Sequence, residues 1–162
     1  MIDRDRRAVA AEVLEACHRA GLTLVTAESC TGGLVAGALT SIPGSSEVYD
    51  RGFVVYSNKA KQDLLGVPGK LIDAHGAVSE EVSRAMAEGA IARSEGTLSV
   101  AVTGIAGPGG GSKDKPVGLV HIAAARKGHA TIHERCRFDG DREAIRQQAV
   151  DSALDLLLRR AD

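Results

Sequence analysis

The fold is decided by residues 22–40, LTLVTAESCTGGLVAGALT. The first part of this stretch, LTLVTA at 22–27, is short, rich in β-branched residues and mostly apolar, as is typical of a strand buried between helices. The last part, LVAGALT at 34–40, has a helical pattern of apolar residues. The segment ESCTGG between them therefore lies at a turn from a strand to a helix, and this turn contains Ser29 and Cys30.

A second glycine-rich loop follows another apolar run. LSVAVT at 98–103 is similar to the first strand, and GIAGPGGGSKDKPVG leads from it to a third strand at 119–125. In open α/β sheets, ligands bind beyond the carboxyl ends of the strands. We therefore expect the loops at 28–33 and 104–111 to face one cleft.

Helices are predicted in the rest of the chain at four places: 3–20, 57–65, the segment that begins at Ser79, and 141–160. Gly21 ends the first of these, because glycine suits a left-handed C-terminal cap. Gly66, Pro68 and Gly69 interrupt the helical pattern after residue 65. One more strand is predicted in the second half of 48–56.

A hairpin is predicted near the end of the chain. Lys127 and Gly128 supply a turn between the strand at 119–125 and an alternating stretch at 129–138, which we expect to be an antiparallel edge strand. Because helices and strands otherwise interleave, we predict an α/β fold, a three-layer α/β/α sandwich with a mixed, mostly parallel sheet and an antiparallel edge. The apolar residues of the edge suggest a homodimer, while its polar and charged residues can equally protect the edge.

Composition limits the classes of function. A chain of 162 residues and 16.8 kDa is typical of one compact domain, so we predict a single domain over 1–162. Only Phe53, Phe138, Tyr49 and Tyr56 are aromatic, so the core must be aliphatic. A formal charge of −1 creates no field that would attract nucleic acid or an anionic membrane, and four scattered aromatic rings cannot stack along a single strand. We therefore expect no nucleic-acid partner and no membrane partner.

The cysteines and the N-terminus favour the cytoplasm. No apolar run approaches the about 20 residues that span a bilayer, and the N-terminal MIDRDRR is charged, unlike a signal peptide. Cys17, Cys30 and Cys136 are odd in number and lack C-x-x-C spacing, which argues against a disulfide framework and a structural zinc site. His129 and His133 share a predicted strand face but lack carboxylate or cysteine companions, so no metal site is expected.

The ESCTGG turn is the first candidate for chemistry. A serine at a strand-to-helix turn projects its hydroxyl, and amides around Thr31, Gly32 and Gly33 can stabilise an oxyanion, so Ser29 is a candidate acyl-forming nucleophile. The alternative is that Ser29 or Thr31 only caps the helix. Cys30 is a rival nucleophile, because a helix N-terminus lowers the pKa of a thiol, or else a small buried residue.

A nucleophilic serine needs a base, and the five histidines are poorly placed for that role. A lysine that burial makes neutral can accept the proton instead, and YSNKAK at 56–61 brings Tyr56 and Lys61 within reach of each other. The alternative is that these lysines face solvent. The S-x-x-K spacing of Ser112 and Lys115 lies in a glycine-rich loop and is taken as accidental.

Phosphate binding is the other candidate chemistry. The loop that begins at Gly104 fits neither the dinucleotide fingerprint nor the P-loop, although its amides can hold an anion. Arg142 and Arg146 lie one turn apart in the last predicted helix and can pair with a phosphate. Salt bridges from these arginines to Asp139 or Glu143 are the alternative.

Several segments together resemble one family, in order and spacing over nearly the whole chain: AESCTGG at 27–33, RGFVVYSNKAK at 51–61, LLGV at 64–67, HGAVSE at 75–80, VTGIAGPGGG at 102–111, KPVG at 115–118 and GDREAIR at 140–146. The chain resembles the CinA C-terminal family, whose stand-alone members are nicotinamide-nucleotide amidohydrolases. This resemblance implies hydrolysis of nicotinamide mononucleotide to nicotinate mononucleotide and ammonia, a step that recycles pyridine nucleotide. It implies no metal and no organic cofactor.

The resemblance also implies roles for individual residues. Ser29 is the nucleophile, Lys61 is the base and Tyr56 assists, while Lys59 is a surface residue. It implies that the loop beginning at Thr103 and Gly104 lines the same pocket and that Gly32 and Gly33 are backbone donors. Together with Thr31 of the turn and Arg142, the candidate for phosphate binding, these residues form the predicted substrate-binding set. Longer members carry an additional N-terminal domain with pyrophosphatase activity, for which this chain has no room, so we expect no metal-dependent nucleotide hydrolysis. A non-catalytic nucleotide-binding regulatory module, or a purely structural domain, remains the alternative.

Overall fold

A mixed five-stranded sheet lies at the centre of the computed structural model, which describes residues 5–162. The strands are β1 (Leu24–Glu28), β2 (Tyr49–Val54), β3 (Leu98–Gly104), β4 (Leu119–Arg126) and β5 (Ile132–Arg137), and their order across the sheet is β2-β1-β3-β4-β5. β1 pairs in parallel with both β2 and β3, whereas β4 runs antiparallel to β3 and β5. The predicted mixed sheet with an antiparallel edge is confirmed.

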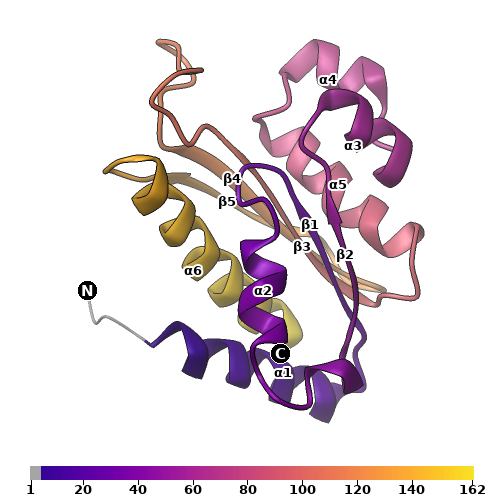
Figure 1. Ribbon diagram of the computed structural model, residues 1–162. Coiled ribbons are helices and arrows are strands. Elements are labelled where there is room, and N and C mark those ends of the chain that lie inside the picture. Colours follow the sequence, from indigo (N-terminus) through magenta and orange to yellow (C-terminus); the bar gives the residue numbers. More distant parts are fainter. Residues whose placement is uncertain (1–4) are drawn as a thin grey trace.

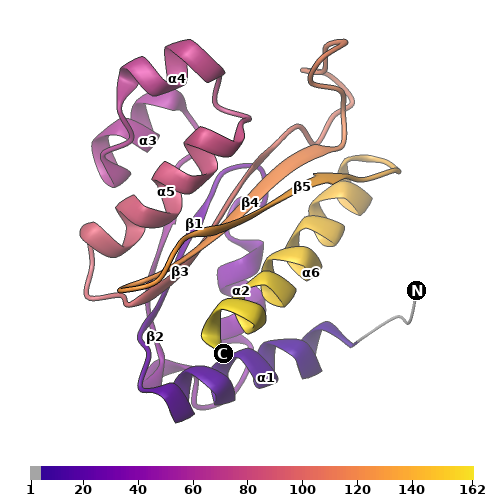
Figure 2. The ribbon, with the colours of Figure 1, turned by 180° about the vertical axis from the view of Figure 1, so that it is seen from behind.

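Helices cover both faces of the sheet (Figures 1 and 2). One face carries α1 (Arg6–Ala20), α2 (Leu34–Thr40) and α6 (Arg142–Ala161), and the other carries α3 (Asn58–Leu65), α4 (Gly69–His75) and α5 (Glu80–Ala92). A 3₁₀ turn, η1 (Ser45–Glu47), precedes β2. The three layers agree with the α/β/α architecture expected from the interleaved patterns.

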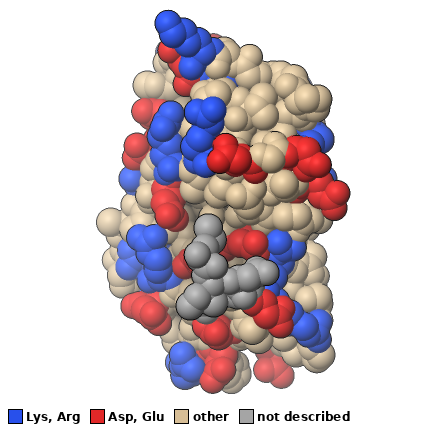
Figure 3. Space-filling view, turned by 90° about the vertical axis from the view of Figure 1, so that its left-hand side faces the viewer, with Lys and Arg blue, Asp and Glu red and all other residues tan. Residues whose placement is uncertain are grey.

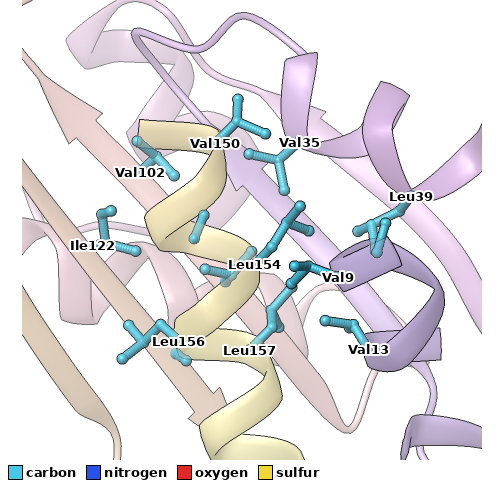
Figure 4. Close-up of a cluster of buried hydrophobic side chains, with 14 of the residues drawn as sticks. Val9, Val13, Val35, Leu39, Val102, Ile122, Val150, Leu154, Leu156 and Leu157 are labelled. Carbon is cyan, nitrogen blue, oxygen red and sulfur yellow. The ribbon is translucent and has the colours of Figure 1, made fainter. Parts of the chain in front are cut away.

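Each helical layer has its own aliphatic core. On the side of α6, Leu154 and Leu157 pack with Val35 of α2 against Val102 and Ile122 of the sheet (Figure 4). The core on the side of α5 is a second cluster, built from Val25, Ala101, Leu65, Met86 and others. Among the described residues no phenylalanine or tyrosine is fully buried in either cluster, as the shortage of aromatic residues predicts.

The sheet brings the two glycine-rich loops together. β1 and β3 are neighbours and run in parallel, with Glu28 opposite Val102, so their carboxyl ends lie at the same edge. The amide of Ser29 donates to the carbonyl of Val102 at 2.9 Å, which joins the ESCTGG turn to the end of β3. Both loops therefore leave the sheet side by side, as expected.

Helix α4 was not expected from the sequence. Gly66 ends α3 in a left-handed conformation, with φ of +68°, as a helix-breaking glycine should. Pro68 and Gly69, which were expected only to interrupt the pattern, are the N-cap and the first residue of α4. A proline is tolerated at a helix start because the N–H that it lacks has no intrahelical acceptor there.

Two other boundaries differ from expectation. β5 begins at Ile132, so His129 lies in the turn after β4, where its amide donates to the carbonyl of Arg126 at 2.9 Å. The first helix begins at Arg6, capped by Asp5, and the predicted start at residue 3 lies outside the described residues. None of the helices within 5–162 combines the length and the apolar character needed to cross a bilayer. Basic and acidic side chains are interspersed on the face of the molecule that Figure 3 shows.

Candidate active site

Ser29 follows the last residue of β1 and begins the turn into α2. Only 8% of Ser29 is exposed, and its carbonyl accepts the N–H of Gly32 at 3.0 Å. Gly32 and Gly33 have φ of +58° and +105°, a region that residues with a Cβ rarely adopt. The two glycines thus allow the tight turn, but the N–H of Gly32 is engaged inside it.

Lys61 reaches Ser29 from the other helical layer. It lies in α3, whose N-cap Ser57 accepts the N–H of Ala60 at 3.0 Å. The Lys61 side chain is buried, with 2% of the residue exposed, and its Nζ lies 3.1 Å from Ser29 Oγ. The structure therefore brings together the two residues that the resemblance pairs as nucleophile and base.

Burial of Lys61 shifts its protonation equilibrium toward the neutral amine. Burial lowers the pKa of Lys61, and only the nearby Cys30 opposes this shift. The ion pairs among residues 5–162 do not include Lys61. Its Nζ also donates to the carbonyl oxygens of Val55 and Tyr56, at 3.0 and 3.3 Å. Ser29 Oγ is the third oxygen around Nζ, and it accepts from Lys61 when the amine is protonated. In the neutral amine the two carbonyl groups can accept both N–H groups, and the lone pair then faces Ser29 Oγ.

Cys30 does not have the properties of a nucleophile. It is buried, with 6% exposed, and burial raises the pKa of its thiol to about 11. The negative charge of Glu28 adds to this increase, while Arg146 and Lys61 oppose it. The expectation that the helix N-terminus lowers the pKa of Cys30 is therefore wrong, because desolvation dominates.

Glu28 is the residue that sequence reasoning missed. Its carboxylate is buried, with 1% of the residue exposed, and it accepts hydrogen bonds from the Thr31 hydroxyl at 2.6 Å, the Val35 N–H at 2.9 Å and the Ala36 N–H at 3.1 Å. An acid adjacent to the turn was visible in the sequence, but a capping carboxylate usually lies next to its helix rather than seven residues earlier. Thr31 is fully buried against Glu28.

A cavity of about 260 Å³ opens beside Ser29 and Lys61. Its lining residues come from both glycine-rich loops, α3, the segment before α5 and the start of α6: Ser29, Cys30, Tyr56, Asn58, Lys61, Ala77, Val78, Thr103, Gly104, Ile105, Ala106, Gly107, Gly109, Gly110 and Arg142. The structure thus brings Thr103, Gly104 and Arg142 to the cavity, whereas Thr31, Gly32 and Gly33 do not line it. Thr103 donates its hydroxyl to the carbonyl of Ala77 at 2.9 Å.

Arg142 and Tyr56 lie at the mouth of this cavity. Tyr56 is 62% exposed, and its hydroxyl accepts a hydrogen bond from Arg142 at 2.9 Å. Arg142 also donates to the carbonyl of Gly107 at 2.8 Å, which ties α6 to the second glycine-rich loop. The Tyr56 hydroxyl is therefore partnered by Arg142, and Lys61 is bound instead by the Tyr56 main chain.

Arg146 has a structural position. It donates to the carbonyl oxygens of Cys30 and Thr31, at 3.0 and 3.3 Å, and so ties α6 to the ESCTGG turn. Among the described residues neither Arg142 nor Arg146 forms an ion pair. Salt bridges to nearby acids on α6 or before it were the expected alternative and are not formed, because backbone carbonyls bind both guanidinium groups.

His121 and His133 form a separate pair on the other side of the sheet from α6. Their rings stack with centroids 5.1 Å apart, and His121 Nδ1 lies 2.8 Å from His133 Nε2. Burial, with the charge of His133 as a smaller cause, lowers the pKa of His121 to about 4. Within residues 5–162 no group of three or more His, Cys, Asp or Glu side chains is arranged to hold a metal ion.

Comparison with known proteins identifies the family. A family model described as the CinA C-terminal domain matches residues 6–161. The chain belongs to the CinA C-terminal domain family. Its sequence is 53% identical over 140 residues to a CinA-like protein of Acidobacterium capsulatum and 50% identical over 155 residues to one of Synechococcus sp., matches that cover 86% and 95% of this chain.

Solved structures of the CinA family share the whole fold. The competence/damage inducible protein CihA from Agrobacterium tumefaciens is 48% identical, with a TM-score of 0.93 and coverage of 98% of this chain and 97% of that one. A CinA superfamily protein from Klebsiella pneumoniae is 35% identical, with a TM-score of 0.92 and 98% coverage of both chains. The curated CinA-like relatives are longer, because the matches span only 34% and 37% of those two proteins.

Proposed function

We propose that this domain is an amidohydrolase that converts nicotinamide mononucleotide to nicotinate mononucleotide and ammonia. The observation that carries the proposal is the buried Lys61 amine 3.1 Å from the Ser29 hydroxyl, at the wall of a cavity. A serine activated by a neutral lysine is suited to acyl transfer, because the lysine can accept and return one proton. The choice of substrate follows from the resemblance to the stand-alone amidohydrolases.

The first half-reaction forms an acyl-enzyme. Neutral Lys61 takes the hydroxyl proton of Ser29 as Ser29 Oγ attacks the carboxamide carbon, and a C–O bond forms. Lys61 then gives that proton to the amide nitrogen, the C–N bond breaks, and ammonia leaves. An ester between the nicotinoyl group and Ser29 remains.

The second half-reaction uses the same two residues in reverse. Lys61 takes a proton from water, and the resulting hydroxide attacks the ester carbon. The bond to Ser29 Oγ breaks, Ser29 recovers a proton from Lys61, and the new carboxylic acid releases its own proton to solvent and leaves as a carboxylate. These steps require no metal and no organic cofactor.

Both half-reactions pass through an oxyanion, which needs hydrogen-bond donors. We place this oxyanion against the amides of Ala106, Gly107, Gly109 and Gly110, which line the cavity, because the N–H of Ile105 is already bound by the carbonyl of Leu119. The N–H of Gly32 is engaged with Ser29, and Glu28 already binds the first free amides of α2, those of Val35 and Ala36. These proposed donors differ from Gly32 and Gly33, the backbone donors that the resemblance implies.

The phosphoribosyl part of the substrate is placed past Arg142. The cavity beside Ser29 has a volume of about 260 Å³, below the range of about 300–1,000 Å³ typical of sites for whole small ligands. A second cavity of about 890 Å³ shares Arg142 and Ala106 with it. We therefore propose that the pyridine amide enters the smaller cavity and that Arg142 contacts the anionic end of the nucleotide.

The decisive experiment measures ammonia release from nicotinamide mononucleotide in the presence of EDTA. Ser29→Ala should reduce turnover at least 10³-fold while the protein keeps its melting temperature. Ser112→Ala is the matched control, because Ser112 is exposed and lies in the S-x-x-K spacing taken as accidental. It should leave turnover unchanged.

Two results would overturn this proposal. Near wild-type turnover by Ser29→Ala would remove Ser29 as the nucleophile. Absence of turnover by the wild-type protein would remove the amidohydrolase assignment. Thermal stabilisation by the nucleotide without ammonia release would then favour a nucleotide-binding module instead.

A further inference from the structure

We propose that Glu28 is a positioning residue that holds the nucleophile turn in its reactive geometry. This inference rests on the proposed function in one respect, because it takes Ser29 as the nucleophile. Glu28 does not line the cavity, so it acts through Ser29 and the turn rather than on the substrate. Its part in the reaction is to keep Ser29 Oγ within reach of Lys61 Nζ.

The side chain of Glu28 ties the turn to the helix that follows. Both of its oxygens are used: Oε1 accepts from the Thr31 hydroxyl and the Val35 N–H, and Oε2 accepts from the Ala36 N–H. These contacts span both sides of the glycine pair at 32–33, which is the most deformable part of the turn. The buried carboxylate therefore closes a loop around Ser29 that two glycines alone would leave free to move.

The main chain of Glu28 ties the same point to the lysine. Its carbonyl accepts the N–H of Val55 at 2.9 Å, and the carbonyl of Val55 accepts the Lys61 Nζ at 3.0 Å. One residue thus connects the serine turn, through its side chain, and the lysine, through Val55. A change in the position of Glu28 would alter the distance between Ser29 Oγ and Lys61 Nζ.

Small displacements matter at this distance. The two reacting atoms are 3.1 Å apart, near the upper end of the range for a hydrogen bond. A misplacement of about 1 Å in an active site can reduce the rate about 10²-fold. Loss of the Glu28 contacts should therefore lower the reactivity of Ser29 with little effect on substrate binding, because none of the contacts reaches the cavity.

The test compares variants that each change one polar group or one methyl group. Glu28→Gln retains one acceptor oxygen but places an N–H₂ group against the N–H of Ala36. Thr31→Val removes the hydroxyl that Glu28 binds, and Thr31→Ser restores it. Glu95→Gln is the control, because Glu95 is exposed.

Two readouts separate positioning from a merely structural role. The first compares the change in kcat with the change in KM for nicotinamide mononucleotide. The second is the rate at which phenylmethylsulfonyl fluoride labels Ser29, followed by mass spectrometry, which needs no turnover. We expect Glu28→Gln and Thr31→Val to lower kcat and the labelling rate at least tenfold with KM changed less than threefold, and Thr31→Ser and Glu95→Gln to stay within twofold of wild type.

Each outcome decides the proposal. A folded Glu28→Gln protein with kcat and labelling rate within twofold of wild type would refute it. If Glu28→Gln does not fold, the comparison of Thr31→Val with Thr31→Ser decides in its place, and equal labelling rates for these two would refute the proposal. Should the wild-type protein release no ammonia, the proposed function fails, while the labelling rates of Ser29 still test the role of Glu28.

Discussion

Lys61 provides the sharpest prediction about this site. An unperturbed lysine, with a pKa near 10.5, is neutral in about one molecule in 3,000 at pH 7. Each unit by which burial lowers the pKa raises that fraction about tenfold. We therefore expect kcat/KM to rise about tenfold per pH unit in the acid range and to level off at the pKa of Lys61, below 10.5. Lys61→Met should lower kcat about 10²–10⁴-fold, the usual contribution of a general base.

The assay is ammonia release between pH 5.5 and 10, with Lys59→Met as the matched control. Lys59 is two residues away, exposed, and paired with Asp63 at 3.3 Å, so its loss should leave the profile unchanged. A flat profile across this range, or one that still rises tenfold per pH unit up to pH 10, would refute the reasoning. So would a Lys61→Met protein that retains a tenth of the wild-type rate.

The same shift has a signature in stability. Because the pKa of Lys61 is lowered in the folded state, the unfolded chain binds more protons between that pKa and 10.5. The contribution of Lys61 to the free energy of unfolding therefore rises with pH across this window and is lost as pH falls through the folded-state pKa. Lys61→Met should remove this contribution, and chemical denaturation at several pH values measures it.

Three further predictions concern the fold. His121 stays neutral in the folded state with a pKa of about 4, so the free energy of unfolding should fall by at most about 3 kcal/mol between pH 6.5 and 4, and less in His121→Gln; equal pH dependence in both proteins would contradict this. Gly89→Ala should lower the free energy of unfolding by about 1–3 kcal/mol, because its Cβ would overlap a backbone carbonyl at the end of α3, while Gly37→Ala, which has open space, should be neutral or stabilising. Leu154→Ala should cost about 2–5 kcal/mol by urea denaturation, since Leu154 is fully buried, and a loss below 1 kcal/mol would contradict its place in the core.

Local patterns accounted for most of the secondary structure. The apolar runs at 22–27 and 98–103 predicted buried strands, and the Ser79 cap predicted α5. Each of these signals involves residues that are close together in the sequence, so each segment can be interpreted without the rest of the chain. α4 was missed for the same reason, because Pro68 and Gly69 can either interrupt a helix or begin one, and packing against α5 decides between the two.

The residues of the site were predictable only in part. Local reasoning left Ser29 between a nucleophile and a cap, and Lys61 between a base and a surface charge, and the resemblance to a family chose between them. Glu28 was missed, and Arg146 was assigned other partners. The roles of both residues depend on donors and acceptors in other elements. Arg146 binds carbonyl groups more than 100 residues earlier in the chain.

The sequence by itself determined the order of the strands and of every α-helix except α4, the aliphatic character of the core and the two glycine-rich turns. Spacing, β-branching and glycine content act on the nearest neighbours in the chain, so these properties are readable without a fold. Only the tertiary structure decided which buried groups meet: Ser29 with Lys61, 32 residues apart, and Tyr56 with Arg142, 86 residues apart. The pKa shifts of Lys61 and Cys30 belong to the same class, because desolvation exists only once the layers have closed over the sheet.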